Sequence, residues 1–149
     1  MPWPTSEELD GLVGRFRART LPKPEWTHLA HLAVGLWHVR EHGPERALEL
    51  LRTGITRLNE AHGTVNDESG GYHETITRAY VCLLSEFIRR HPGLAAADCV
   101  QAVLAGPLAG KTALLRYYSK ESLLSVSARQ GWVEPDLEPL RLTDSMPAD

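Results

Sequence analysis

Histidine is the residue type whose spacing in this sequence most clearly suggests chemistry. Four of the seven histidines, His28, His31, His38 and His42, fall in one segment with helical periodicity. At roughly 100° per residue they lie within an arc of about 80° on one helical face. Histidine is the commonest ligand of metal ions and the usual proton carrier near neutral pH. This stripe therefore predicts a site for metal binding or for proton transfer.

The length of that helix divides the four histidines into two pairs. His28 and His42 would lie about 21 Å apart along the axis, so one ion cannot bind both. His38 and His42 end the helix, where the macrodipole and the last carbonyls stabilise a cationic ring. His28 and His31 begin it, where a cation opposes the dipole, so we expect neutral rings there. A neutral imidazole is the form that binds metal ions.

Helical periodicity extends through nearly the whole chain, and no segment shows the period-two alternation of a strand. Thr5 and Glu8 form a capping-box pattern, and Pro44 stands at a first-turn position. Helices are predicted over about residues 6–18, 27–41, 44–62, 73–90 and 94–105, with one or two shorter helices in 107–128. We therefore predict an all-α, single-domain helical bundle over residues 1–149, with about four long helices, shorter C-terminal helices and a disordered tail from about 142.

The connections between these helices determine which histidines meet. A very short turn at Gly43 predicts that the second and third helices are antiparallel, and the loop 63–71 predicts the same for the third and fourth. The helix starts at His28 and His73 then lie at one end of the bundle. His28, His31 and His73 are accordingly predicted to bind one divalent metal ion, with an open position for water or substrate. Zn, Fe, Mn and Cu all suit such a site, and the sequence does not select one.

Three side chains near this end are candidates for catalysis. Glu74 and Glu68 are predicted to act as a general base, and Tyr72 to take part in proton transfer. Glu74 has two other interpretations, a fourth metal ligand or an ion pair with Arg78 one turn later, and we favour the ion pair. Glu68 belongs to a polar loop whose glycines suit a lid over the site. His62 either joins the site or caps the third helix.

Six side chains are candidates for binding a small-molecule substrate. Thr77 and Tyr80 continue a polar line down the inner face of the fourth helix, where they would orient ligands. Cationic side chains of the C-terminal third would clamp a carboxylate or a phosphate. The alternative for Lys111, Arg116 and Arg129 is a solvated helix face with aromatic anchors. The predicted substrate-binding residues are Trp26, Asn66, Thr77, Tyr80, Arg116 and Tyr118.

Composition and patterning argue against several kinds of partner. The formal net charge is −3 and charges of both signs are interspersed, so we predict no binding to nucleic acid. Because no leader segment and no membrane-spanning apolar run occur, we expect a cytoplasmic protein that does not enter membranes. The Gly-Lys-Thr at 110–112 is interpreted as a break between helices, since no strand precedes it as nucleotide binding would require. Cys82 and Cys99 are predicted to be buried reduced thiols.

Three functions remain open on this basis. The favoured one is a metal-dependent enzyme, a hydrolase, lyase or oxidase, that acts on a small polar or anionic molecule. The second is a non-catalytic binding or interaction protein, with structural histidines and apolar helix faces that form a homodimer or a partner groove. The third is a metal-free enzyme in which His73 works with Tyr72 or Tyr118 in acid–base catalysis.

Overall fold

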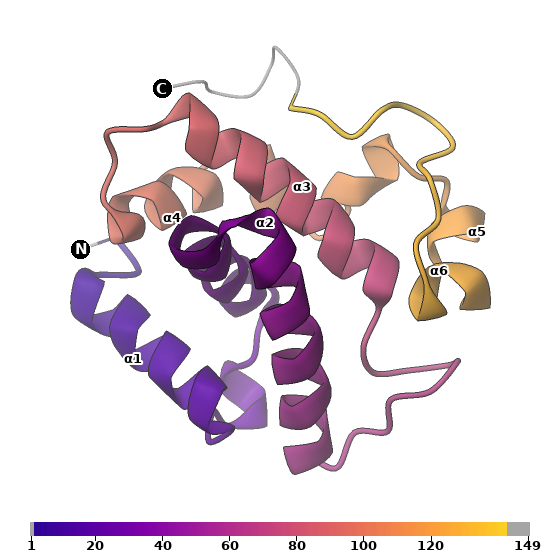
Figure 1. Cartoon of the computed structure of the whole chain (residues 1–149), viewed down its shortest axis with the longest axis horizontal. Helices are drawn as coiled ribbons and strands as arrows, with labels where there is room; N and C mark the ends of the chain where they lie inside the picture. The colour runs from indigo at the N-terminus through magenta and orange to yellow at the C-terminus, as the bar shows by residue number, and fades with distance from the viewer. Residues whose placement is uncertain (1, 143–149) are drawn as a thin grey trace.

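The computed structural model describes residues 2–142. This part of the chain contains nine helical segments and no strand. The longer helices are α1 (Ser6–Ala18), α2 (His28–Ala61), α3 (Glu74–Arg90) and α4 (Ala96–Leu104), and the short helices α5 (Lys120–Leu123) and α6 (Val126–Gln130) follow (Figure 1). Three 3-10 helices lie in the connections, at Lys23–Glu25, Pro107–Ala109 and Ala113–Arg116. The predicted all-α bundle with shorter C-terminal helices is confirmed.

Polar side chains at the preceding residue fix where α1 and α2 begin. Thr5 Oγ1 accepts a hydrogen bond from the Glu8 amide at 3.1 Å, and a Glu8 carboxylate oxygen accepts one from the Thr5 amide at 2.9 Å. Thr27 Oγ1 accepts from the Ala30 amide at 3.1 Å. The predicted capping box is therefore present, and both caps satisfy amides that the first turn of a helix leaves unpaired.

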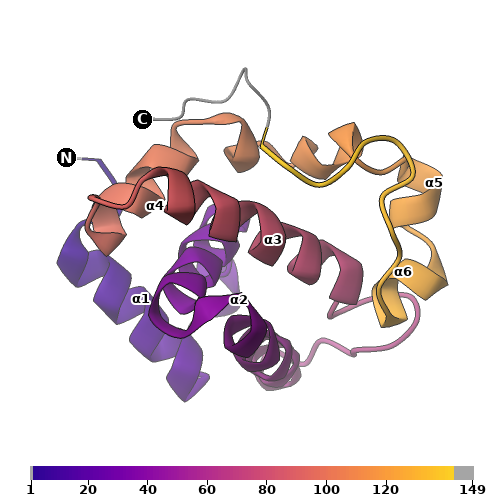
Figure 2. The same ribbon diagram turned by 45° about the horizontal axis from the view of Figure 1, so that its top comes forward.

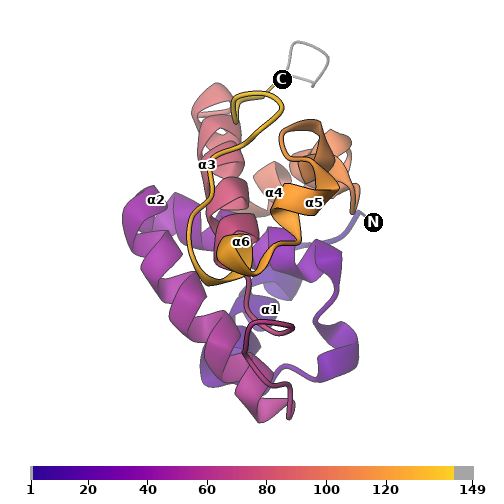
Figure 3. The same ribbon diagram turned by 90° about the vertical axis from the view of Figure 1, so that its right-hand side faces the viewer.

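Helix α2 bends at Gly43, whose backbone is non-helical (φ 80°, ψ 165°). The predicted boundary between two helices at Gly43 is present, because α2 consists of two helical halves that meet at a kink there. Gly43 leaves the helical conformation and Pro44 opens the second half. The second half turns back toward the start of the first, since Ile55 and Asn59 line the same groove as His31 (Figures 1 and 3).

Phe16 of α1 fills the inner side of this bend. A Cβ atom added at Gly54, in the second half of α2, would lie only 2.5 Å from Phe16 Cζ. The Phe16 ring centroid also lies 5.6 Å from that of His38 in the first half and 5.3 Å from that of Trp26. Glycine at position 54 thus permits one aromatic ring to contact both halves of α2, which ties α1 to the bend.

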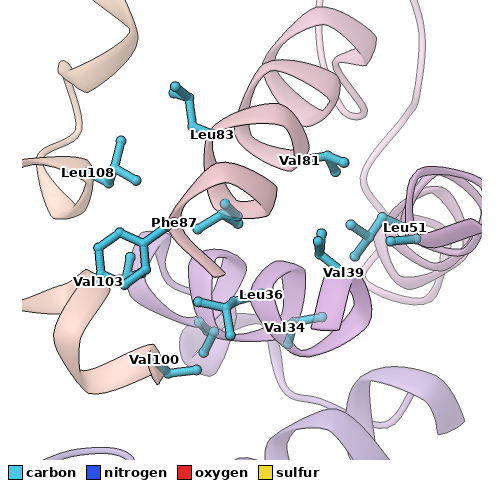
Figure 4. Close-up of a cluster of buried hydrophobic side chains, with 14 of the residues drawn as sticks. Val34, Leu36, Val39, Leu51, Val81, Leu83, Phe87, Val100, Val103 and Leu108 are labelled. Carbon is cyan, nitrogen blue, oxygen red and sulfur yellow. The ribbon is translucent and has the colours of Figure 1, made fainter. Parts of the chain in front are cut away.

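The apolar core lies where the first half of α2 meets α3 and α4 (Figure 4). Its members include Val34, Leu36 and Val39 from α2, Leu83 and Phe87 from α3, and Val100 and Val103 from α4. Full burial of one such side chain stabilises a fold by about 1.5–3 kcal/mol. This core therefore fixes α3 and α4 in place against α2.

The chain after α6 runs along α3 (Figure 2). Thr75 Oγ1 donates a hydrogen bond to the Gly131 carbonyl at 2.7 Å and accepts one from the Val133 amide at 3.1 Å. Eleven residues after Gly131, Leu142 is buried against the core. The predicted disordered tail therefore does not include Leu142, and its remaining residues, 143–149, lie outside the described residues.

Cysteine burial follows the prediction at one position only. Both thiols are free, and Cys99 is buried, but Cys82 is exposed. Cys82 follows Val81 and precedes Leu83 on α3, and these neighbours occupy the buried side of the helix. The apolar composition around Cys82 therefore did not indicate which face its side chain would occupy. None of the helices described is long and apolar enough to cross a membrane.

Replacement of Gly43 by alanine tests the role of the bend. A Cβ at Gly43 meets no atom within 4 Å, so the positive φ angle is the main source of strain. We expect Gly43→Ala to lower the free energy of unfolding by about 1–2 kcal/mol in urea denaturation. The matched control is Gly11→Ala, in α1, where a Cβ is equally free of contacts. That change should raise stability by about 0.5–1 kcal/mol, and equal effects at both positions would contradict a strained bend.

Candidate functional site

A largely apolar cavity of about 350 Å³ lies between the two halves of α2, α3 and the loop that carries Lys111. Its apolar walls are formed by Leu32, Leu51, Ile55, Ile76, Val81 and Leu84. Leu32 comes from the first half of α2, and Leu51 and Ile55 come from the second. The cavity therefore depends on the bend at Gly43, because a straight helix could not present both halves to one space.

Polar and aromatic side chains complete the lining. They are Trp26, His28, His31, Thr77, Tyr80 and Lys111. Five of the residues predicted to bind substrate or metal thus meet at one cavity: Trp26, His28, His31, Thr77 and Tyr80. The Thr77 hydroxyl donates to the His73 carbonyl at 2.8 Å. Burial raises the pKa of Tyr80 to about 12, so its hydroxyl is neutral at pH 7.

His31 has the most closely defined chemistry of these side chains. Its Nδ1 lies 2.7 Å from the Thr27 carbonyl, which only accepts hydrogen bonds, so Nδ1 carries the proton and Nε2 keeps its lone pair. The Trp26 ring stacks on the imidazole with centroids 3.6 Å apart. The residue keeps an exposed edge, yet packing around the ring lowers its pKa to about 4, so it is neutral at pH 7. Nε2 is therefore available as a hydrogen-bond acceptor or a base.

His28 differs from His31 in having a nitrogen without a partner. Its Nε2 is buried and forms no hydrogen bond within the described residues. Burial lowers the pKa of His28, and the nearby Lys111 ammonium lowers it further, while backbone groups of Gly110 and Ala109 partly offset the effect. The ring contacts Tyr80 edge-on, with centroids 6.0 Å apart. The ring is therefore neutral at pH 7, as predicted for a histidine in the first helical turn.

His73 has a structural task that occupies both of its ring nitrogens. Nδ1 accepts a hydrogen bond from the Ile76 amide at 3.1 Å, which makes His73 the N-cap of α3. Nε2 donates to the Leu123 carbonyl at 2.8 Å, which holds α5 against the start of α3. The side chain lines a neighbouring groove together with His31 but does not line the cavity.

The predicted three-histidine ligand set is consequently not assembled. A metal ligand needs a nitrogen lone pair, and both nitrogens of His73 are engaged in hydrogen bonds. Between residues 2 and 142, no three histidine, cysteine, aspartate or glutamate side chains are grouped so that they could hold a metal ion. The starts of α2 and α3 do lie close together, because His31 and His73 line one groove. Hydrogen bonds occupy both ring nitrogens of His73, whereas only Nδ1 of His31 is bonded to a backbone carbonyl.

Glu74 and Tyr72, two of the predicted catalytic residues, belong to a separate polar cluster. Arg52 donates two hydrogen bonds to the Glu74 carboxylate, at 2.9 and 2.6 Å. The Tyr72 hydroxyl donates to the same carboxylate at 2.7 Å. The expected Glu74–Arg78 ion pair is wrong, because Arg78 instead lies over the Trp132 ring at 4.3 Å. No local signal in the sequence identified Arg52, whose partner lies on another helix.

Asn66 and Glu68 lie in the loop between α2 and α3, outside the cavity. Asn66 Nδ2 donates to the Thr56 carbonyl at 3.0 Å, and its Oδ1 accepts from Asn59 at 3.0 Å and from the Tyr72 amide at 2.9 Å. These bonds attach the loop to the end of α2, so Asn66 has a structural role. Glu68 is exposed to solvent.

The remaining predicted residues, Arg116, Tyr118 and His62, form contacts outside the cavity. Arg116 pairs with Glu138 at 3.6 Å on the surface, and the buried Tyr118 donates to the Val133 carbonyl at 2.7 Å. Neither lines the cavity, whereas Lys111, from the same third of the chain, does. His62 Nε2 donates to the Leu21 carbonyl at 2.7 Å. This last bond ties the end of α2 to the segment after α1.

Comparison of the chain with protein-family models, with curated proteins and with solved structures finds no match in any of the three. The candidate site is therefore defined by its geometry alone.

The pH dependence of stability should report the buried histidines. Burial lowers the pKa of His73 below its ordinary value of 6.5, so below about pH 6.5 the unfolded chain binds more protons than the folded one. Stability from this group is thus present above pH 6.5 and is lost as the pH falls toward 5. His73→Asn keeps an N-cap acceptor but does not titrate. We expect this variant to have a free energy of unfolding about 1 kcal/mol lower at pH 7.5. Between pH 7.5 and 5, its free energy of unfolding in urea should fall by less than that of the natural protein. An equal loss in both proteins would contradict this.

Removal of the unpartnered nitrogen at His28 should stabilise the protein. A buried polar group without a partner costs about 1–3 kcal/mol. We expect His28→Phe to raise the free energy of unfolding by about 1 kcal/mol while the ring keeps its contact with Tyr80. The matched variant is His38→Phe, in the same helix, whose Nδ1 bonds the Val34 carbonyl at 2.8 Å. That variant should have a lower free energy of unfolding. If His38→Phe raises it as His28→Phe does, ring size and not the unpartnered nitrogen explains the effect of both substitutions.

Proposed function

We propose that this chain binds a small, largely apolar molecule in the cavity between the two halves of α2 and α3. The observation that carries the proposal is the cavity itself, at about 350 Å³ with six apolar wall residues and a few polar groups. Ligand sites commonly measure about 300–1,000 Å³, are mostly apolar and hold a small number of placed polar groups. Other pockets of the described residues are larger, so the mainly apolar lining with a few polar groups, and not the size alone, distinguishes this cavity as a binding site.

His31 supplies the polar contact that would orient such a ligand. Its Nε2 accepts hydrogen bonds, since the Thr27 carbonyl holds the proton on Nδ1. The stacked Trp26 ring limits rotation of the imidazole. A ligand hydroxyl or amine that donates to Nε2 therefore meets an acceptor whose tautomer and orientation are set before binding.

Acid–base catalysis by His31 is the second candidate function. A neutral imidazole with one free nitrogen, oriented by a carbonyl on the other, is the arrangement in which histidine removes a proton from a substrate. This candidate resembles the predicted metal-free acid–base enzyme in its chemistry but assigns the base to His31 in place of His73. Binding in the cavity is its first requirement, so the binding test comes first.

Titration with 1-octanol tests binding in the cavity. At about 0.5 kcal/mol for each of its nine non-hydrogen atoms, within the range found for small ligands, 1-octanol has an expected dissociation constant below about 1 mM. We expect calorimetry to show this affinity in the natural protein. Ile55→Trp, which places a large ring in the cavity wall, should weaken binding at least about tenfold. His31→Phe keeps a ring on Trp26 but removes the acceptor, and should weaken binding by about three- to tenfold.

Leu124→Trp provides the matched control, because Leu124 is 58% exposed and lies away from the cavity. It should bind 1-octanol as the natural protein does. Absence of binding in the natural protein, or equal binding in Ile55→Trp, would overturn the proposed function.

A further inference from the structure

We infer that the ligand of this cavity is a small carboxylic acid, whose carboxylate pairs with Lys111 and whose apolar chain lies against the cavity walls. This inference rests on the proposed function and adds the charge of the ligand. It assigns recognition of the ligand's carboxylate to Lys111 and not to His31, because a carboxylate accepts hydrogen bonds and cannot donate one to His31 Nε2.

Lys111 is the only charged side chain among the described residues that line the cavity. The six ion pairs found within residues 2–142 all use arginine as the cation, so Lys111 has no carboxylate partner there. The two histidines in the lining are neutral at pH 7. The cavity therefore carries one positive charge that no acidic side chain of the lining balances, and an anionic ligand would complement it.

The start of α2 adds to this positive potential. His28 is the first residue of α2, and the first turn of that helix contains no acidic side chain. The positive end of the helix dipole therefore lies at the same side of the cavity as His28. Lys111 and His28 both line the cavity, so the ammonium and this helix start border the same space. Two sources of positive potential thus converge at one end of an apolar space.

The division between charge and apolar surface specifies the shape of the ligand. Leu32, Leu51 and Leu84 are buried, whereas Lys111 is exposed. A carboxylate at Lys111 would thus stay in contact with water at the rim, and its chain would enter the apolar interior, so the charge need not be fully desolvated. A volume of about 350 Å³ is that of roughly a dozen waters at about 30 Å³ each, which suits a chain of roughly eight to ten carbons.

A monocarboxylate matches the lining better than a dianionic phosphate. Lysine provides one positive charge on a flexible stem and no planar fork, whereas phosphate sites commonly use bidentate arginine. No arginine lines the cavity among the described residues. One cation therefore balances one negative charge.

Three ligands with the same eight-carbon chain test the inference: octanoate, 1-octanol and octylammonium, titrated by calorimetry at pH 7.5. We expect octanoate to bind about three- to tenfold more tightly than 1-octanol, and octylammonium more weakly than either. Lys111→Met should abolish the preference for octanoate over 1-octanol, and Lys111→Glu should make octylammonium the tighter of the two charged ligands. Lys120→Met, which removes a lysine outside the cavity lining, is the matched control and should keep the natural preference.

The outcomes separate the ligand charge from the cavity itself. If 1-octanol binds in the cavity at least as tightly as octanoate, or if Lys111→Met keeps the full preference, the carboxylate assignment is overturned while small-molecule binding stands. If none of the three ligands binds the natural protein, the proposed function fails together with the inference. Circular dichroism of each variant confirms that a lost preference does not come from a lost fold.

Discussion

The change of direction at Gly43 is the constraint on which the site depends. Gly43, with a positive φ angle, ends the first helical half of α2, and Pro44 begins the second half in a new direction. Phe16 fills one side of the bend, against the bare backbone of Gly54. The cavity occupies another part of it, and α3 closes that part with Ile76, Val81 and Leu84. The same backbone feature therefore provides both a packed contact for α1 and a space large enough for a ligand.

The histidines show how hydrogen bonding divides one residue type among different tasks. A backbone amide and a carbonyl occupy both nitrogens of His73, so it joins elements of the fold. One carbonyl fixes the tautomer of His31 and leaves a lone pair free. Nε2 of His28 is buried at the cavity that Lys111 also lines, without a hydrogen bond to any residue from 2 to 142. Convergence of imidazoles at one end of a bundle is therefore insufficient for a metal site, because lone pairs must also be available.

Local patterns in the sequence were enough to define the helices. The capping box at Thr5 and the apolar spacing predicted α1, α3, α4 and the start of α2 closely, since caps and periodicity act within a few residues. The candidate lining residues Trp26, His28, His31, Thr77 and Tyr80 were also identified, though for a different site. Side chains that pair over long distances escaped prediction, as Glu74 did with Arg52.

The sequence by itself determined an all-α fold and a histidine pair at the start of a helix. These follow from periodicity and from capping, which are properties of neighbouring residues. The tertiary structure alone decided how the two halves of α2 are oriented across Gly43, that both nitrogens of His73 are hydrogen-bonded, and that Lys111 reaches the same cavity as His28 and His31. Each of these depends on which distant backbone groups and helix faces come into contact, and only three-dimensional packing sets that.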